Sequence, residues 1–255
     1  MDTSGMTVFE FGEKKLAMGD IDPLYNALWK AEWPMERVSR YILAFVAFDL
    51  AGLAGQIVDR GAKGFWPAMH HAVDQTKRGS PRRYYRGQAA HDSLTALQTR
   101  YRTAEKALFS LEGDFADASA EVAAHWPGWG PTAAWKIADM AERCRGVYID
   151  FSNFGWDQLL SNDMIVKGLD KAVAISKPRD GRAEMQHFLM RHDWKHQAPG
   201  IPGKPVGPQE IETILCYYSH DWKTNKHMPG MDKENIRAEL TAIPSRHGHQ
   251  LLEVL

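Results

Sequence analysis

Apolar residues recur at helical spacing along most of the chain, and no segment shows the strict alternation typical of a strand. The strongest pattern covers residues 35–58, where apolar positions fall on more than one face, as in a central, mostly buried helix. Residues 91–111 carry them on one face, which predicts a long surface helix. We therefore expect an all-α fold. Further helices are predicted to start near Pro23 and over residues 65–75, 115–125, 132–143, 157–175, 182–192, 208–222 and 232–240.

The domain organisation follows from where this pattern stops. Residues 1–20 are mixed and polar, and we expect them to form a loose N-terminal extension. Residues 198–208 are rich in proline and glycine, which predicts a surface loop. No break is strong enough to force two independent domains, so residues 21–255 are predicted to form one helical catalytic domain.

Composition excludes several classes of protein. Charged residues make up 25% and hydrophobic residues 44% of the 255 residues, as in a folded globular protein and unlike a disordered one. The longest apolar run, residues 41–53, is interrupted by Asp49 and is too short to span a bilayer. Two cysteines cannot make a disulfide framework or a four-cysteine zinc site. Without a signal-peptide pattern at the start, we expect a cytoplasmic protein that binds no membrane.

The net charge of −1 conceals an uneven distribution. Residues 77–106 carry eight basic and two acidic side chains, whereas residues 1–76 and 107–255 are both mildly acidic. Arginine binds phosphate through a planar fork, and tyrosine can stack on bases. The alternative interpretation of such a run of charges is a solvent-exposed helix face that binds nothing. The candidate DNA contacts in this segment are Arg82, Arg83, Tyr85 and Arg86.

The sharpest local motif covers residues 125–138, which read as a helix, a Pro-Gly-x-Gly turn and a second helix. Gly128 and Gly130 permit positive φ, and amides at the start of the second helix point outward, where they can bind a phosphate. The motif resembles the helix-hairpin-helix of the DNA glycosylase superfamily, predicted here near residues 115–145. The alternative is a plain turn between antiparallel helices. Its candidate DNA contacts are Gly128, Gly130, Thr132 and Lys136.

The glycosylase resemblance also points to Asp150. In that superfamily a catalytic aspartate follows the hairpin at a nearly fixed interval, which lands on Asp150 when counted from Thr132. A partly buried carboxylate there could stabilise a cation or take a proton from a nucleophile. Thr132 stands where the bifunctional enzymes have lysine, so no Schiff base is expected. The structural alternative is that Asp150 caps a helix over residues 151–156.

A second constellation lies near the C-terminus. Glu212, Cys216 and either Ser219 or His220 fall on one predicted helix face, with Lys223 in the following loop. Such groups could hold a zwitterion, a pyrophosphate or a metal, although the spacing is poor for zinc. Charges that enter the apolar helix at residues 36–40 need ion-pair partners or a ligand. The candidate substrate-binding residues are Glu36, Arg37, Arg40, Trp156, His220 and Lys223.

Several segments together resemble the phage amino acid:DNA transferases, also described as α-glutamyl/putrescinyl thymine pyrophosphorylases. They are residues 33–37, residues 82–87, the Trp-rich hairpin and residues 212–220. The resemblance covers roughly residues 20–245. It implies a helical fold like that of the DNA glycosylases. It also implies a reaction at thymine bases that carry a pyrophosphorylated 5-hydroxymethyl group, in which an amino acid amine displaces pyrophosphate.

In that reading, the modified base of double-stranded DNA leaves the stack to meet a free amino acid, with glycine and serine as candidates. A carboxylate, Asp150 or Glu212, takes the proton from the attacking ammonium. Lysine, arginine or a divalent metal ion neutralises the departing pyrophosphate. No P-loop is present, so the chain is not expected to phosphorylate the base. We expect a monomer in the cytoplasm of the host cell.

Two other functions fit the same residues. A monofunctional DNA glycosylase would use Asp150 to release a base and leave an abasic site, without an amino acid. A non-catalytic helical module would bind DNA and turn over nothing.

Overall fold

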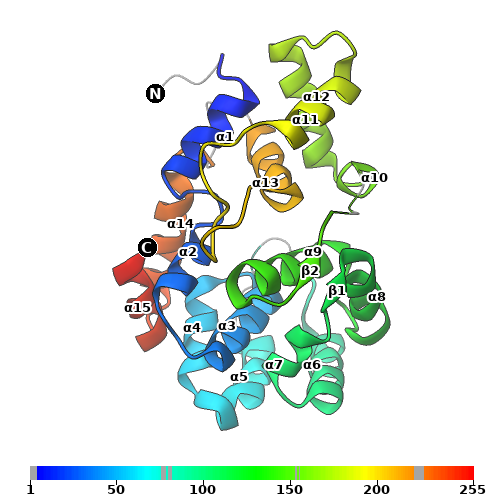
Figure 1. The fold of residues 1–255 in the computed structure, drawn as a ribbon. Coiled ribbons are helices and arrows are strands. Elements are labelled where there is room, and N and C mark those ends of the chain that lie inside the picture. Colours follow the sequence, from blue (N-terminus) through cyan, green and yellow to red (C-terminus); the bar gives the residue numbers. More distant parts are fainter. Residues whose placement is uncertain (1–4, 76–78, 80–81, 153, 155, 221–226) are drawn as a thin grey trace. The chain divides into compact units, whose positions relative to one another are not determined.

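The computed structural model describes residues 5–75, 79, 82–152, 154, 156–220 and 227–255. Helices make up most of this described chain, which confirms the predicted all-α fold (Figure 1). Contacts divide the chain into two units. The first unit comprises residues 1–26 and 151–235, and the second unit comprises residues 27–150 and 236–255. The boundaries fall within α2 (Pro23–Lys30) and α14 (Met231–Ala242).

The first unit is a group of packed helices around α13 (Pro208–Tyr218). Helix α13 packs against α1 (Val8–Ala17), α11 (Asp163–Ser176) and α12 (Gly181–Arg191). Gly168 of α11 lies against the backbone of Leu215, where a Cβ would overlap the carbonyl oxygen. The glycine therefore lets the two helix backbones approach closely. A short helix, α10 (Trp156–Leu159), precedes α11.

Residues 8–17 form α1 instead of the loose extension that we expected. Thr7 caps the helix through a reciprocal capping box with Glu10, which satisfies backbone amides of the first turn. Val8 and Phe11 are fully buried. The helix is thus anchored by its apolar face, which the charged residues interspersed among the apolar ones made hard to recognise.

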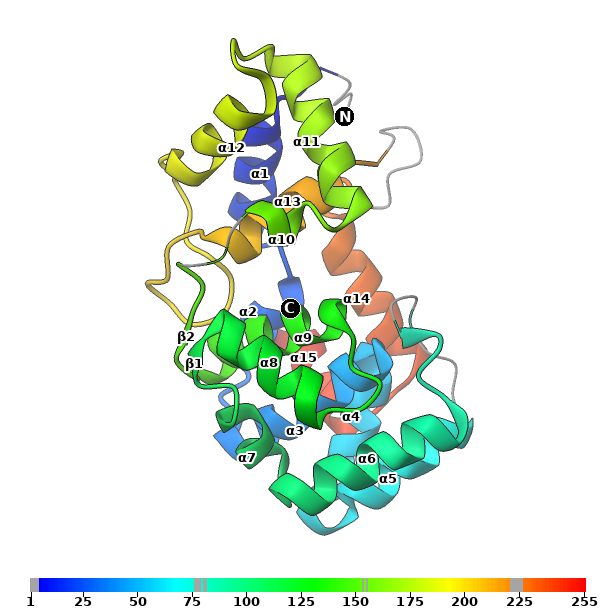
Figure 2. The same cartoon turned by 90° about the vertical axis from the view of Figure 1, so that its right-hand side faces the viewer.

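The second unit is organised around α3 (Met35–Phe48), which packs against several other helices of the unit. Every residue from Tyr41 to Phe48 is buried, so this helix has no solvent-facing side in its second half. The remaining elements are α4 (Ala51–Asp59), α5 (Gly61–Gln75), α6 (Gly87–Tyr101), α7 (Ala104–Phe109), α8 (Phe115–His125), α9 (Pro131–Met140), the π-helical η2 (Ala141–Arg145) and α15 (Arg246–Val254). In both views, α5 and α6 lie side by side (Figure 2).

Two helices that the pattern predicted as continuous are broken. The helix expected over residues 35–58 ends at Asp49, which has left-handed geometry with φ of 55°, and α4 then begins. The helix expected over residues 91–111 is interrupted at Arg102, with φ of 66°, before Thr103 caps α7. Both breaks use non-glycine residues in the left-handed region, which is uncommon and leaves no clear sequence signal.

Two further features lie outside the predicted pattern. Strand β1 (Gly113–Asp114) pairs in parallel with β2 (Ile149–Asp150), with Asp114 opposite Asp150. Helix α15, beyond the predicted final helix, packs on α4. A search of the described residues finds no helix long and apolar enough to cross a membrane.

Candidate active site

The predicted hairpin is present in the second unit. Helices α8 and α9 pack against each other and are joined by the turn at residues 126–130. Gly128 has φ of 77°, the left-handed geometry that glycine tolerates, and Gly130 precedes Pro131 at the first position of α9. Both glycines are exposed, as a contact with another backbone would require. The turn geometry is as predicted, while its relationship to the glycosylase hairpin stays a prediction.

Arg82 connects the basic segment to this turn. Its Nη1 donates to the carbonyl oxygen of Gly128 at 3.2 Å, and its Nε donates to that of Ala47 at 3.4 Å. The guanidinium lies over the rings of Tyr85 and Trp129, 4.3 and 4.8 Å from their centroids. Burial lowers the pKa of Arg82 to about 10, which still leaves the group charged at neutral pH. The buried arginine therefore binds the backbone of the hairpin turn from the interior of the unit.

The other predicted DNA contacts differ in exposure. Tyr85 is buried, and its hydroxyl donates to Ser93 Oγ at 3.0 Å. Arg83 and Arg86 are exposed, as is Tyr84, a residue that is 75% exposed and whose ring lies under the Arg83 guanidinium. The exposed aromatic of this segment is thus Tyr84, which the sequence reading passed over in favour of its neighbour. Contact of any of these residues with DNA stays a prediction.

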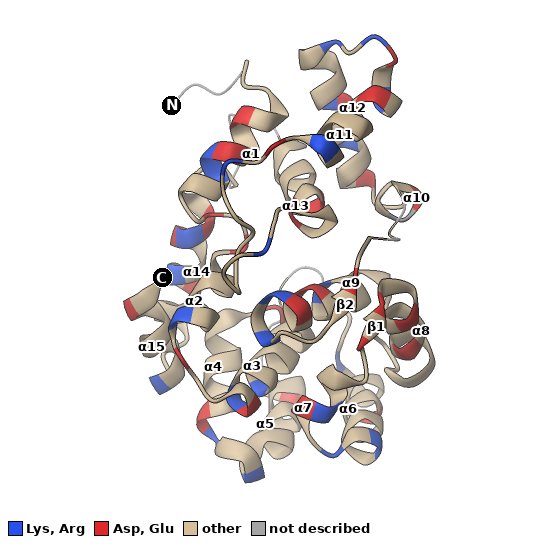
Figure 3. Ribbon diagram, in the orientation of Figure 1, with Lys and Arg blue, Asp and Glu red and all other residues tan. Residues whose placement is uncertain are grey.

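The exposed basic side chains continue along neighbouring elements. Arg100 of α6, Arg102 just after that helix and Lys106 of α7 are all exposed, and Figure 3 shows basic positions on these helices in blue. In α9, Thr132 is exposed in the first turn, and Lys136 lies 4.0 Å from Asp139 Oδ2. The second unit therefore presents basic side chains both on the hairpin and on the segment tied to it by Arg82.

Asp150 ends the short strand β2 in the second unit. Its register partner Asp114 caps α8 by accepting from the Asp117 amide at 2.8 Å, so β2 is tied to the start of the hairpin. The alternative that Asp150 caps a helix over residues 151–156 is wrong, since α10 begins only at Trp156. The carboxylate is partly exposed. Its catalytic role stays a prediction.

The charges at the start of α3 form an ion pair. Glu36 and Arg40, one helical turn apart, are in contact, and the Arg40 side chain is only 11% exposed. Arg40 Nε is buried without a hydrogen-bond partner among the described residues. Arg37 is partly exposed on the same helix. Of the two interpretations of these charges, the structure shows the ion pair between Glu36 and Arg40. A contact with a substrate stays a prediction.

In the first unit, α13 carries the second predicted carboxylate. Thr213 Oγ1 donates to Asp22 Oδ2 at 3.1 Å and lies 3.4 Å from Glu212 Oε2, so one hydroxyl lies beside two carboxylates. After the helix, His220 Nδ1 lies 3.1 Å from the carbonyl oxygen of Cys216. Trp156 belongs to this unit as well, and Lys223 lies outside the described residues.

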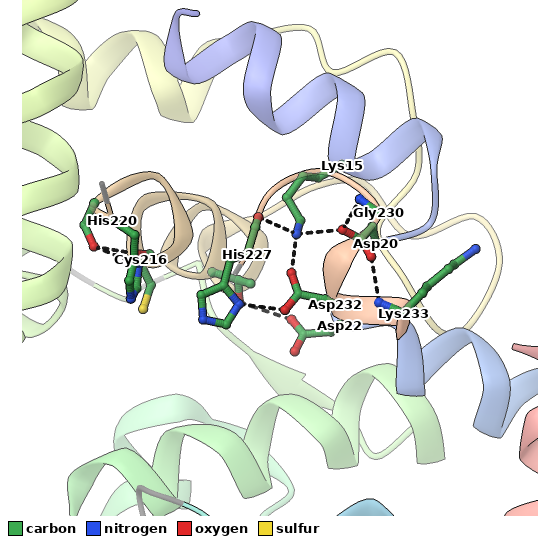
Figure 4. Close-up of polar contacts among 11 residues, drawn as sticks. Lys15, Asp20, Asp22, Cys216, His220, His227, Gly230, Asp232 and Lys233 are labelled. Carbon is green, nitrogen blue, oxygen red and sulfur yellow. Dashed lines mark hydrogen bonds and ion pairs between the residues drawn. The ribbon is translucent and has the colours of Figure 1, made fainter. Parts of the chain in front are cut away.

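A buried ionic cluster adjoins α13, and the sequence pattern did not predict it (Figure 4). Lys15 of α1 is fully buried and pairs with Asp20 at 2.8 Å and with Asp232 of α14. Asp232 Oδ1 also bonds His227 Nδ1 at 2.6 Å. The signal in the sequence was a lysine on the apolar face of α1, in line with Val8 and Phe11. We call Lys15, Asp20, His227 and Asp232 the buried cluster.

A metal ion was one of the ligands considered for the constellation near the C-terminus. Among the described residues, no three His, Cys, Asp or Glu side chains are grouped so that they could hold a metal ion.

The sequence is similar to one protein family and to two enzymes of bacteriophages. The family model for amino acid:DNA transferases matches residues 17–227. A glycinyltransferase of Pseudomonas phage PaMx11 is 28% identical over 271 aligned positions, which cover 94% of this chain and 91% of the relative. A putrescinyltransferase of Delftia phage PhiW-14 is 27% identical over 218 positions, which cover 79% of this chain and 68% of the relative.

Proposed function

The chain belongs to the amino acid:DNA transferase family, and from this premise we propose that it modifies phage DNA by transferring an amino acid or a related amine to a base. The acceptor in this proposal is a thymine whose 5-hydroxymethyl group is pyrophosphorylated. The donor's nitrogen attacks the 5-methylene carbon, a C–N bond forms, and the C–O bond to pyrophosphate breaks. The family match, which extends over most of the chain, is the observation that carries the proposal.

The second unit is proposed to hold double-stranded DNA. The amides of the exposed residues Gly130 and Thr132 at the start of α9, together with the exposed Arg83 and Arg86, would contact phosphates, which fix position without reading sequence. Tyr84 has an exposed ring that could stack on a base or brace the strand after the target base leaves the stack. Arg82 would act indirectly, by holding the turn.

The reacting groups are proposed to include the two predicted carboxylates, Asp150 and Glu212. Each could stabilise the donor's ammonium or take its proton. The remaining predicted substrate contacts would bind the donor or the pyrophosphate; they are Glu36, Arg37, Arg40, Trp156, His220 and Lys223. Positive side chains would stabilise the charge that develops on the leaving group.

The donor is proposed to be a small amino acid, with glycine tested first. The glycinyltransferase relative aligns with 94% of this chain, against 79% for the putrescinyltransferase. Serine and putrescine are the comparison donors. We further propose that the protein works as a monomer in the cytoplasm of the infected cell.

The test is a transfer assay on modified DNA. Purified protein is incubated with DNA that contains pyrophosphorylated 5-hydroxymethyluracil and with one donor at a time, and the nucleosides are analysed by mass. We expect a nucleoside whose mass matches addition of one donor, at a rate reduced in Asp150→Asn or Glu212→Gln. Abasic sites would instead indicate a glycosylase, and DNA binding without any product would indicate a binding module.

A further inference from the structure

The proposed transfer requires a group that takes a proton from the donor's ammonium, and the following inference rests on that proposed function. A carboxyl group has an ordinary pKa of about 4 and an imidazole one of about 6.5, so an imidazole is the better-matched base near neutral pH. The first unit places one histidine, His227, in a setting typical of such a base.

The His227 ring is held from two sides. Its Nδ1 lies 2.6 Å from Asp232 Oδ1, and its plane is stacked on Tyr217 with ring centroids 4.1 Å apart and an angle of 3° between the planes. Its backbone carbonyl oxygen accepts from Lys15 Nζ at 3.0 Å. Both the ring and the backbone of this residue are therefore fixed.

Asp232, the partner of the imidazole, is itself fixed by buried charges (Figure 4). It pairs with the ammonium of Lys15, which also pairs with Asp20 at 2.8 Å. Asp20 in turn accepts from the amides of Gly230 and Lys233 at 2.7 and 2.8 Å. These contacts tie the end of α1 to the segment that carries His227 and Asp232.

We propose that His227 takes the proton from the donor's amine and that Asp232 is the positioning residue that orients it. An Nδ1–H bond to the carboxylate leaves the ring's lone pair on Nε2, the arrangement of a histidine base oriented by an aspartate. The ammonium transfers one proton to Nε2, and the free amine attacks the 5-methylene carbon. Pyrophosphate leaves with the electron pair of the C–O bond, and His227 returns its proton to solvent. Asp150 and Glu212 then keep the other role proposed for them, which is to stabilise the positive charge of the donor's ammonium.

A purely structural role explains less of this arrangement. Lys15 and Asp20 are fully buried, and with Asp232 they form an ion cluster without any contribution from the imidazole. The His227 side chain is 17% exposed, so it is the member of the buried cluster that solvent reaches most. The ring is therefore not needed for charge compensation among Lys15, Asp20 and Asp232, and part of it reaches solvent.

Four side chains face the His227 ring or its backbone. They are Asp232, the Lys15 ammonium, the stacked Tyr217 and the His220 ring, whose centroid lies 5.0 Å away. Burial first, and then the carboxylates of Asp22 and Asp232, raise the pKa of Tyr217. The phenol therefore stays neutral across the range in which an imidazole titrates.

The test is single-turnover transfer at saturating donor across pH, with the full-length chain. His227→Asn keeps an N–H that can donate to Asp232 but has no basic nitrogen. We expect its rate to fall by about 10²- to 10⁴-fold, and the dependence of the rate on pH to differ from that of the wild-type protein. The matched control is His187→Asn, an exposed histidine on α12 of the same unit, which should behave as wild type.

A second variant separates chemistry from folding. His227→Ala should regain activity in proportion to added imidazole, which a merely structural residue would not show. A rate for His227→Asn within twofold of the control, with the pH profile unchanged, would overturn the assignment while the transferase function stood. Absence of transfer by the wild-type protein with every donor would instead overturn the proposed function itself, and this inference with it.

Discussion

Replacement of Lys15 by methionine tests whether the buried cluster holds the first unit together. Methionine has a similar length and fits an apolar helix face, but it leaves the carboxylates of Asp20 and Asp232 without their shared cation. The Asp20 side chain is fully buried, and that of Asp232 is 8% exposed. Removal of one partner from a buried ion pair typically costs about 3–5 kcal/mol. That is a large part of the roughly 5–15 kcal/mol that holds a typical domain folded.

The assay is urea unfolding followed by circular dichroism. With an m-value of about 2–3 kcal/mol/M, the expected loss lowers the urea midpoint by roughly 1–2 M. Lys14→Met on the same helix is the control, since Lys14 is exposed and its replacement should change the free energy of unfolding by less than about 0.5 kcal/mol. In an Asp20→Asn background, Lys15→Met should cost at least about 1 kcal/mol less, because the two residues share one interaction. Equal midpoints for the Lys14 and Lys15 variants would refute the reasoning.

Three further predictions concern the second unit. Gly128→Ala should lower the free energy of unfolding by about 1–2 kcal/mol, because the φ of 77° at this position is left-handed. Gly130 has φ of −74° and open space around an added Cβ, so Gly130→Ala should change that free energy by less than about 0.5 kcal/mol in thermal unfolding. Equal losses in the two variants would contradict the assigned turn geometry. Arg83→Ala and Arg86→Ala should each weaken DNA binding and flatten the slope of log K against log salt by about 0.9, and an unchanged slope would exclude the phosphate contact. Burial lowers the pKa of His247, so the unfolded state binds its proton first as the pH drops; stability should fall below about pH 6.5, and a decline of the same size in His247→Gln would exclude this cause.

Local chemistry made part of the structure predictable. The hairpin was found because proline and glycine act on their immediate neighbours, and α8 has the bounds that the sequence predicted. The all-α class followed from helical periodicity alone. The breaks at Asp49 and Arg102 were missed because each is a non-glycine residue in left-handed geometry, which surrounding packing imposes and composition does not signal.

The buried cluster lay beyond local reasoning for a different reason. Lys15 and Asp232 are 217 positions apart, and only the folded chain shows that they pair. The same holds for Arg82 and Tyr85, whose residue types favour DNA contact but whose positions are buried beneath the hairpin turn. Residue type thus indicated a candidate segment, whereas burial decides which of its side chains, such as Arg83 and Tyr84, are exposed.

The central claim is a transfer in which a donor amine replaces pyrophosphate on the base. Its most direct measurement compares pyrophosphate released with isotope-labelled glycine incorporated into the same DNA. The account predicts one pyrophosphate for each glycine bound, with the base still attached to its sugar. Release of pyrophosphate without incorporation of any tested amine, or loss of the base from the DNA, would contradict it.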